Sequence, residues 1–155
     1  MGSGAEAVSE TVDYLNARGQ KVGVVKVRLY RPFPTDAFVN AIPETVKTIT
    51  VLDRTKEPGS LGEPLYLDVV AALGEKGVAK EVLCGRYGLG SKEFNPSMVN
   101  AIYANMNGAK KNHFTIGITD DVSFTSLDVT EKIDVAEPST ISCKFYGLGS
   151  DGTVG

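Results

Sequence analysis

The chain has one histidine and two cysteines in 155 residues, and these shortages exclude several kinds of catalytic and metal site. A Ser-His-Asp or Cys-His arrangement needs a histidine, and His113 is the only one available. Because His113 begins an expected strand beside two lysines, we expect it to be exposed and non-catalytic. Cys84 and Cys143 are too few and too far apart for a metal-ligand pattern or an iron–sulfur spacing. The sequence therefore predicts no catalytic residue and no metal site in this chain.

Long apolar runs and an excess of positive charge are also missing. No run approaches the roughly 18 apolar residues of a membrane helix, and the first residues lack the basic and apolar regions of a signal peptide. A formal net charge of −3 and a pI near 5.2 argue against nucleic acid or an anionic membrane as the main partner. Together with the low cysteine content, these absences predict a cytoplasmic protein.

What the sequence does contain is an alternation of helix and strand signals. Helices are expected where apolar residues recur every three or four positions, and strands where β-branched residues cluster between glycines and prolines. The expected helices span residues 5–18, 35–42, 64–73 and 95–107, and the expected strands span residues 22–30, 46–52, 78–85 and 113–119. This alternation predicts an α/β fold with three layers, in which a doubly wound and mostly parallel sheet lies between helices.

The two ends of the chain suggest where domains begin and end. Residues 2–4 have the sequence of a strand-to-helix turn, so we expect one strand of the sheet to be missing at the N-terminus. After residue 120 the periodicity gives way to an irregular polar stretch, and residues 141–146 resemble the first strand of another unit. The sequence thus predicts an α/β domain over residues 1–120, a linker over 121–140 and the truncated start of the next domain over 141–155.

The glycine turn that follows residue 146 is the best local candidate for ligand binding. Gly147, Gly149 and Gly152 permit left-handed backbone and close approach to an anion. Ser150 can add a hydroxyl donor to a phosphate. The alternative is a purely structural strand-to-helix turn, which Asp151 favours as a helix cap.

Cations near the end of the expected strand 22–30 are candidates for contacts between domains. Lys26 and Arg28 alternate to the same face of that strand, and Arg31 follows at its end. In a sheet covered on both faces, such charges meet carboxylates of a neighbouring domain, reach solvent or contact a phosphate. We favour the first of these alternatives.

A second charged cluster follows the expected strand 46–52. Asp53 and Arg54 lie at its carboxyl end, where ligand sites of α/β proteins form. A structural pairing of Asp53 with Arg54 or Lys56 is the alternative. The residues for which we predict interdomain roles are Arg28, Arg31, Asp53 and Arg54.

Five segments spread over nearly the whole chain point to a protein family. These segments span residues 27–33, 52–59, 85–94, 117–122 and 144–155. In this order they resemble the pyruvate:ferredoxin (flavodoxin) oxidoreductases. The chain looks like the second domain of that family, which is similar to the C-terminal domain of transketolase, plus the first strand and turn of the following gamma-like domain.

The resemblance implies a parent enzyme of anaerobic metabolism that converts pyruvate and coenzyme A to acetyl-CoA and CO₂. Such a parent uses thiamine diphosphate, Mg²⁺ and [4Fe–4S] clusters, passes electrons to ferredoxin or flavodoxin and forms a homodimer. The domains that bind substrate, diphosphate and clusters have no counterpart in this chain, so we expect a fragment that carries no cofactor and is inactive alone. Its partners would be the remaining domains of the parent.

The resemblance also gives the terminal turn a ligand, because the gamma-like domain is associated with coenzyme A. On this basis Gly147, Gly149, Ser150 and Gly152 are expected to contact a coenzyme A phosphate. Two alternatives remain open. The chain is a small α/β module that binds a nucleotide or coenzyme A phosphate through its glycine-rich turns, or a degraded reading frame of the parent without a selected function.

Overall fold

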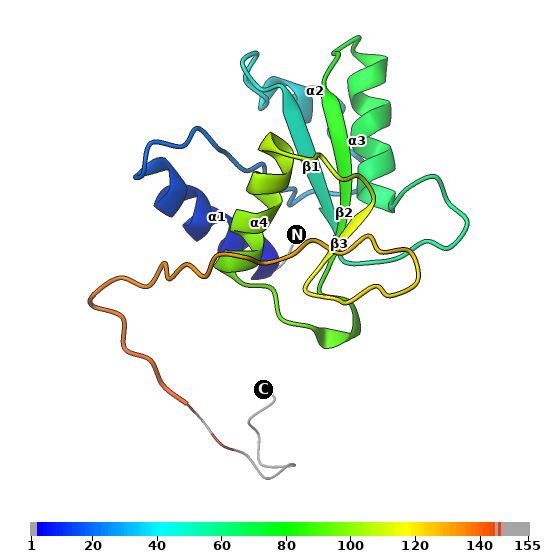
Figure 1. Ribbon diagram of the computed structural model, residues 1–155. Coiled ribbons are helices and arrows are strands. Elements are labelled where there is room, and N and C mark those ends of the chain that lie inside the picture. Colours follow the sequence, from blue (N-terminus) through cyan, green and yellow to red (C-terminus); the bar gives the residue numbers. More distant parts are fainter. Residues whose placement is uncertain (1–2, 145, 147–155) are drawn as a thin grey trace.

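The computed structural model describes residues 3–144 and 146 of the chain. In this part, helices and strands alternate around one sheet (Figure 1). The helices are α1 (Ser3–Asn16), α2 (Thr35–Asn40), α3 (Pro64–Glu75) and α4 (Pro96–Asn107), the strands are β1 (Thr48–Asp53), β2 (Glu81–Tyr87) and β3 (Phe114–Ile116), and a 3₁₀ turn, η1, spans Leu89–Ser91. The four expected helices and the last three expected strands are confirmed, with ends shifted by a few residues.

The sheet is parallel throughout and has the order β1-β2-β3. Because successive side chains of a strand point to opposite faces, β1 contributes to two apolar clusters. Val51 packs with Phe38 of α2 and with the buried face of α3. Leu52 packs on the other side, against α1 and α4. Both faces of the sheet are therefore covered, which confirms the expected α/β class with helices flanking a parallel sheet.

Helix α1 approaches the end of β2 closely. Its buried side chains Val8, Val12 and Leu15 follow the helical period and pack against α4. The helix begins at Ser3, so Gly4 lies inside α1 and not in a turn ahead of it, as the sequence had suggested. A Cβ atom on Gly4 would lie 2.8 Å from the ring of Tyr87, so a larger residue at this position would require that ring to shift.

The expected strand over residues 22–30 is wrong. In the described structure this segment pairs with no strand, and part of its backbone bonds to side chains instead. Asn16 exchanges two hydrogen bonds with the backbone of Val22 (3.1 and 3.0 Å), and the Tyr103 hydroxyl donates to the carbonyl of Gly23 (2.8 Å). The β-branched pattern is present, but a strand also requires a neighbouring backbone for its ladder.

Residues beyond β3 run along the domain. Thr115 of β3 exchanges backbone hydrogen bonds with Thr125 (3.1 Å) and Leu127 (2.8 Å). Ile133 then donates its backbone N–H to the hydroxyl of Ser97 in α4 (3.0 Å). Residues 125–133 thus extend the edge of β3 and cross α4, while the domain boundaries expected at residues 120 and 140 stay a prediction.

Candidate functional site at the carboxyl edge of the sheet

Polar side chains gather where β1 and β2 end. Asp53, the last residue of β1, lies in register with Arg86 of β2. Strand alternation directs Asp53 and Arg86 towards α3, whereas Arg54 and Tyr87 face α1 and α4. The edge of the sheet therefore has two separate halves, one on each face.

Asp53 caps α3. Its carboxylate oxygens accept hydrogen bonds from the backbone N–H groups of Leu65 (3.1 Å) and Tyr66 (3.1 Å) in the first turn of that helix. Asp53 is only 5% exposed, and this burial raises the pKa of its carboxyl while the two helix N–H groups act in the opposite direction. Within the described chain it forms no ion pair with Arg54 or Lys56, so the pairing considered from the sequence is not the one formed.

Glu63 and Arg86 form a buried ion pair beside this cap. Their side chains are 6% and 15% exposed, and Arg86 Nη1 lies 3.5 Å from Glu63 Oε1. The other carboxylate oxygen of Glu63 accepts from the backbone N–H of Glu57 (2.7 Å), and Arg86 Nη2 donates to the carbonyl of His113 (3.0 Å). The pair therefore fastens the loop of residues 54–63 to β2 and to the start of β3.

Sequence reasoning missed both members of this pair. The available signal was Arg86 itself, because an arginine inside a buried parallel strand needs a buried acid for compensation. That acid could not be identified from spacing, since Glu63 lies in a loop that reaches β2 only through the fold.

Cys84 and His113 do not have a catalytic setting in the described structure. Cys84 is buried in β2, and burial raises the pKa of its thiol, which keeps the sulfur protonated. His113 is exposed, and its ring meets the edge of the Tyr66 ring at a centroid distance of 5.7 Å. The described residues thus place His113 at the surface, as expected from the sequence.

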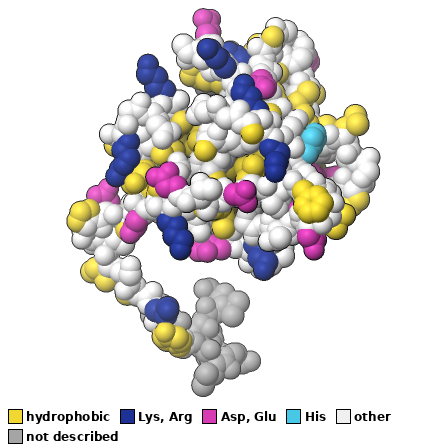
Figure 2. All heavy atoms as spheres, in the orientation of Figure 1, with side chains coloured by type: hydrophobic (Ala, Val, Ile, Leu, Met, Phe, Trp, Pro, Cys, Tyr) yellow, Lys and Arg dark blue, Asp and Glu magenta, His cyan; other side chains and the backbone are white. Residues whose placement is uncertain are grey.

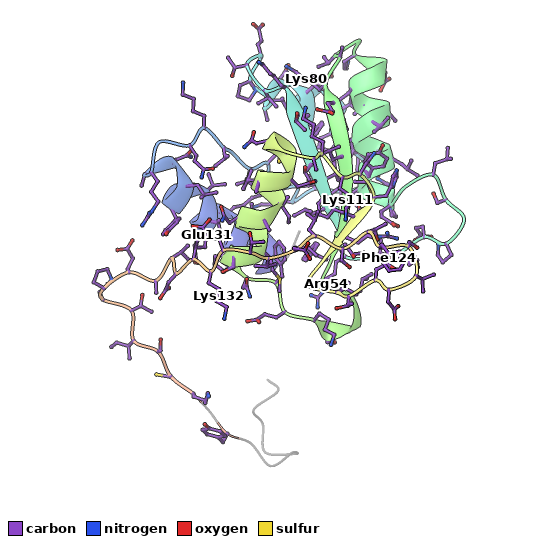
Figure 3. All side chains as sticks on the ribbon, viewed as in Figure 1. Arg54, Lys80, Lys111, Phe124, Glu131 and Lys132 are labelled. Atoms are coloured by element: carbon purple, nitrogen blue, oxygen red, sulfur yellow. The ribbon has the colours of Figure 1, made fainter. Side chains whose placement is uncertain are left out.

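On the opposite face, Arg54 lies at the end of β1 (Figure 3) and contacts the turn after β2. Its Nε donates to the carbonyl oxygen of Gly88 (3.1 Å). Gly88 has a left-handed backbone with φ of +64°, and a Cβ atom there would lie 2.9 Å from Arg54 Nε. Glycine is therefore required at this position both for the turn and for the approach of Arg54.

A cavity of about 170 Å³ opens beside this contact, and we call it the Arg54 cavity. Its lining residues are Gly4, Arg54, Tyr87, Gly88, Lys92 and Phe94. The rings of Tyr87 and Phe94 lie 4.5 Å apart at their centroids. Burial raises the pKa of Tyr87, so its phenol stays neutral at physiological pH. Among the residues that the structure describes, the lining thus combines two cations with aromatic rings and includes no acid.

Arg28 and Arg31, for which interdomain contacts were predicted, have partners within the domain. Arg31 donates to Asp68 of α3 (2.8 Å) and stacks on the ring of Tyr30. Arg28 lies 3.8 Å from Glu6 of α1, and its side chain remains 81% exposed. Lys26 lies 2.8 Å from the same Glu6. The prediction had placed Lys26 and Arg28 on one face of a strand, but this segment does not form a strand. The interdomain roles of Arg28, Arg31, Asp53 and Arg54 stay predictions.

Other expected features fall outside this site. The terminal turn with Gly147, Gly149, Ser150 and Gly152 lies outside the described residues. Among residues 3–144 and 146, no cluster of three or more histidine, cysteine or acidic side chains is arranged to hold a metal ion. The described helices also include none with the length and apolar character needed to span a bilayer. Figure 2 shows basic and acidic side chains intermixed over one face of the molecule.

Comparison of the sequence with known protein families gives a match to a family model. Residues 1–99 match the sequence model of a family described as pyruvate:ferredoxin oxidoreductase core domain II. This match covers more than half of the chain and includes α1, β1, α3, β2 and the Arg54 cavity.

Comparison with individual proteins gives matches over the full chain. A pyruvate:ferredoxin oxidoreductase from Moorella thermoacetica is 60% identical over 156 residues, and a pyruvate-flavodoxin oxidoreductase from Trichormus variabilis is 60% identical over 159. A mitochondrial pyruvate dehydrogenase [NADP(+)] from Euglena gracilis is 55% identical over 162. The alignments cover 100% of this chain but only 13%, 13% and 9% of these relatives.

Proposed function

Because the chain belongs to the pyruvate:ferredoxin oxidoreductase core domain II family, we propose that it is a structural domain that docks against other domains of such an enzyme. The parent would oxidise pyruvate with coenzyme A, release acetyl-CoA and CO₂, and pass electrons to ferredoxin or flavodoxin. The chain spans about 13% of the length of its first relatives, so this activity is proposed for the parent and not for the fragment alone.

The main support for a structural role is that the charged groups on the α3 side of the sheet edge are paired within the domain. Asp53 is occupied by the N–H groups of α3, and Glu63 is occupied by Arg86 and by the backbone of Glu57. A general acid or base must reach the proton that it transfers. These buried carboxylates face their own domain and serve to fix its loops.

The surface that we propose for docking is residues 24–29, called here the exposed strap. Val25 and Leu29 are 44% and 55% exposed, and Arg28 extends from the same segment. The backbone of these residues enters no strand ladder in the described structure, so its polar groups remain available to a neighbouring surface. An apolar contact and one cation from the strap would then meet an acidic patch of the adjoining domain.

Arg31, Asp53 and Arg54 would support docking from within the domain. Arg31 ties the end of the strap region to α3 through Asp68. Asp53 and Arg54 fix α3 and the turn after β2 by the hydrogen bonds described above. Their proposed interdomain role is therefore indirect, whereas that of Arg28 is a direct contact.

The described residues do not provide the side-chain ligands that the iron–sulfur clusters and Mg²⁺ implied by the family need. A [4Fe–4S] cluster needs four cysteine thiolates, and the chain has two cysteines. The described residues also contain no group of three or more potential ligands that could hold Mg²⁺. We therefore assign the clusters, Mg²⁺ and thiamine diphosphate to other parts of the proposed parent.

Other roles suggested by the family resemblance extend this proposal. In the proposed parent, the turn with Gly147, Gly149, Ser150 and Gly152 would contact a phosphate of coenzyme A. The parent would act as a homodimer in the cytoplasm. Each of these roles belongs to the longer enzyme.

The docking role predicts different effects of Arg28→Ala in two settings. In the 155-residue chain the change should leave the unfolding temperature nearly unchanged, because solvent screens an ion pair that is this long and this exposed. In the full-length oxidoreductase it should lower the unfolding temperature and speed proteolytic cleavage between domains, because the contact with the neighbouring domain is lost. Calorimetry and timed proteolysis measure the two quantities.

Arg18→Ala provides the matched control. Arg18 is also an exposed arginine, but its contacts are with Tyr14 of its own helix. Arg18→Ala should leave both the unfolding temperature and the rate of proteolytic cleavage of the full-length enzyme unchanged. If Arg28→Ala behaves like Arg18→Ala in the full-length enzyme, the strap is not a docking surface.

A further inference from the structure

We propose that the Arg54 cavity binds the phosphate group of a small molecule. This inference goes beyond the docking role and does not depend on it. Arg54 and Lys92 line the cavity from different segments, after β1 and after η1, and none of the described residues that line it is acidic. Two cations that converge without a carboxylate between them favour an anion in the space that they share.

Arg54 is held in place before any ligand arrives. Its Nε donates a hydrogen bond to the carbonyl of Gly88 (3.1 Å), and Arg54 is one of the residues that line the cavity. The left-handed glycine at position 88 lets the arginine lie against the backbone, where a Cβ atom would push it away. A fixed guanidinium loses less conformational freedom on binding than a mobile one, which favours bidentate recognition of phosphate.

Two acids near Arg54 in the chain, Asp53 and Glu63, are engaged on the other face of the sheet. Asp53 points to α3, where two helix N–H groups occupy its carboxylate. Glu63 is paired with Arg86 on that same side. These two carboxylates therefore do not cancel the positive charge of Arg54, and the exposed acids Glu57 and Glu93 are not among the residues that line the cavity.

The position and size of the cavity fit a small ligand. It lies at the carboxyl ends of parallel strands, where α/β proteins bind ligands. Gly4 of α1 also lines it. Its volume of about 170 Å³ is several times the ~30 Å³ share of a water molecule and accommodates a phosphate. The rings of Tyr87 and Phe94 limit water on one side.

Titration with inorganic phosphate tests the proposal directly. The ¹⁵N-labelled 155-residue chain is titrated at constant ionic strength, with chloride exchanged for phosphate, and amide shifts are followed by NMR. We expect saturable shifts at Gly88 and Gly90. Arg54→Gln and Lys92→Gln should each weaken the affinity about fivefold or more, because each removes a charge-assisted contact.

Controls separate this site from general charge attraction. Lys132→Gln removes an exposed cation of the segment that crosses α4 (Figure 3) and should leave the phosphate affinity unchanged. Lys92 lies on an exposed turn, so Lys92→Gln should fold even if Arg54→Gln does not. The proposal is overturned if phosphate gives no saturable shifts, or if Lys132→Gln weakens binding as much as Lys92→Gln.

A parallel titration with acetate distinguishes the source of the anion. Weaker shifts with acetate than with phosphate support a phosphate-bearing small molecule. Saturable binding of acetate with little response to phosphate would contradict the proposal and identify the site as a receptor for a protein carboxylate. Neither outcome affects the Arg28→Ala experiment, so the docking role can fail or succeed independently.

Discussion

Gly88 and Gly90 adopt nearly the same left-handed backbone but have different surroundings. Their φ angles are +64° and +61°. A Cβ atom on Gly88 would meet Arg54, whereas a Cβ atom on Gly90 would find no atom within 4 Å. The two positions therefore separate the cost of the backbone conformation from the cost of displacing Arg54.

We predict that Gly90→Ala lowers the free energy of unfolding by ~1–2 kcal/mol, the usual cost of a left-handed non-glycine residue. Gly88→Ala should cost about 1 kcal/mol more, because it also disrupts the hydrogen bond from Arg54. Urea denaturation of both variants of the chain measures the difference. Equal losses would show that the Arg54 contact contributes nothing to the fold.

At the scale of elements, α3 is anchored by a residue that lies outside it. Glu63, the residue at its N-cap position, forms no capping hydrogen bond, and the cap comes from Asp53 at the end of β1. Helix α4 follows the common local pattern, in which Asn95 accepts from the backbone N–H of Met98 (3.1 Å). The cap of α3 thus connects a helix to the sheet, while the cap of α4 is local.

This difference predicts unequal effects of removing the two caps. Asn95→Ala should lower the free energy of unfolding by ~0.5–2 kcal/mol. Asp53→Ala should lower it more, by roughly 2–4 kcal/mol, because two buried N–H groups lose their acceptor. Urea denaturation checks both values. A smaller loss for Asp53→Ala than for Asn95→Ala would show that burial of the carboxylate offsets its hydrogen bonds.

The same contrast explains how far the sequence could predict this structure. The Asn95-Pro96 start of α4 and the apolar stripe of α1 depend on neighbours within a few residues, and both were predicted correctly. The cap by Asp53 and the Glu63–Arg86 pair depend on which strands adjoin, so spacing alone did not reveal them. The strand expected over residues 22–30 failed for a related reason, since β-propensity describes one segment and a ladder needs two.

The sequence indicated where Arg54 lies but did not predict the Arg54 cavity. The position of Arg54 after a parallel strand marked the correct edge of the sheet. The participation of Lys92 and Gly4 depends on how the turn after β2 and the start of α1 fold back to that edge. No periodicity in the sequence relates these three residues.

At the scale of the whole molecule, the family match and the buried pairing together support a domain that acts through assembly. The chain matches relatives along its full length while covering 13% of theirs. Its sheet edge on the α3 side is closed by Glu63 and Arg86, which fasten the loop of residues 54–63. The central claim is that this pair stabilises the domain and takes no part in pyruvate chemistry.

Glu63→Gln in the full-length oxidoreductase tests this claim most directly. The amide keeps an acceptor for the Glu57 N–H but removes the charge that compensates Arg86, which costs roughly 3–5 kcal/mol for a buried pair. Glu131→Gln is the control, because Glu131 is exposed and bonds to Asn100 at the surface. The measurement is the unfolding temperature together with kcat for pyruvate oxidation well below that temperature. We predict a lower unfolding temperature for Glu63→Gln alone and a kcat within about twofold of the unchanged enzyme, whereas a kcat reduced about tenfold or more at an unchanged unfolding temperature would contradict the account.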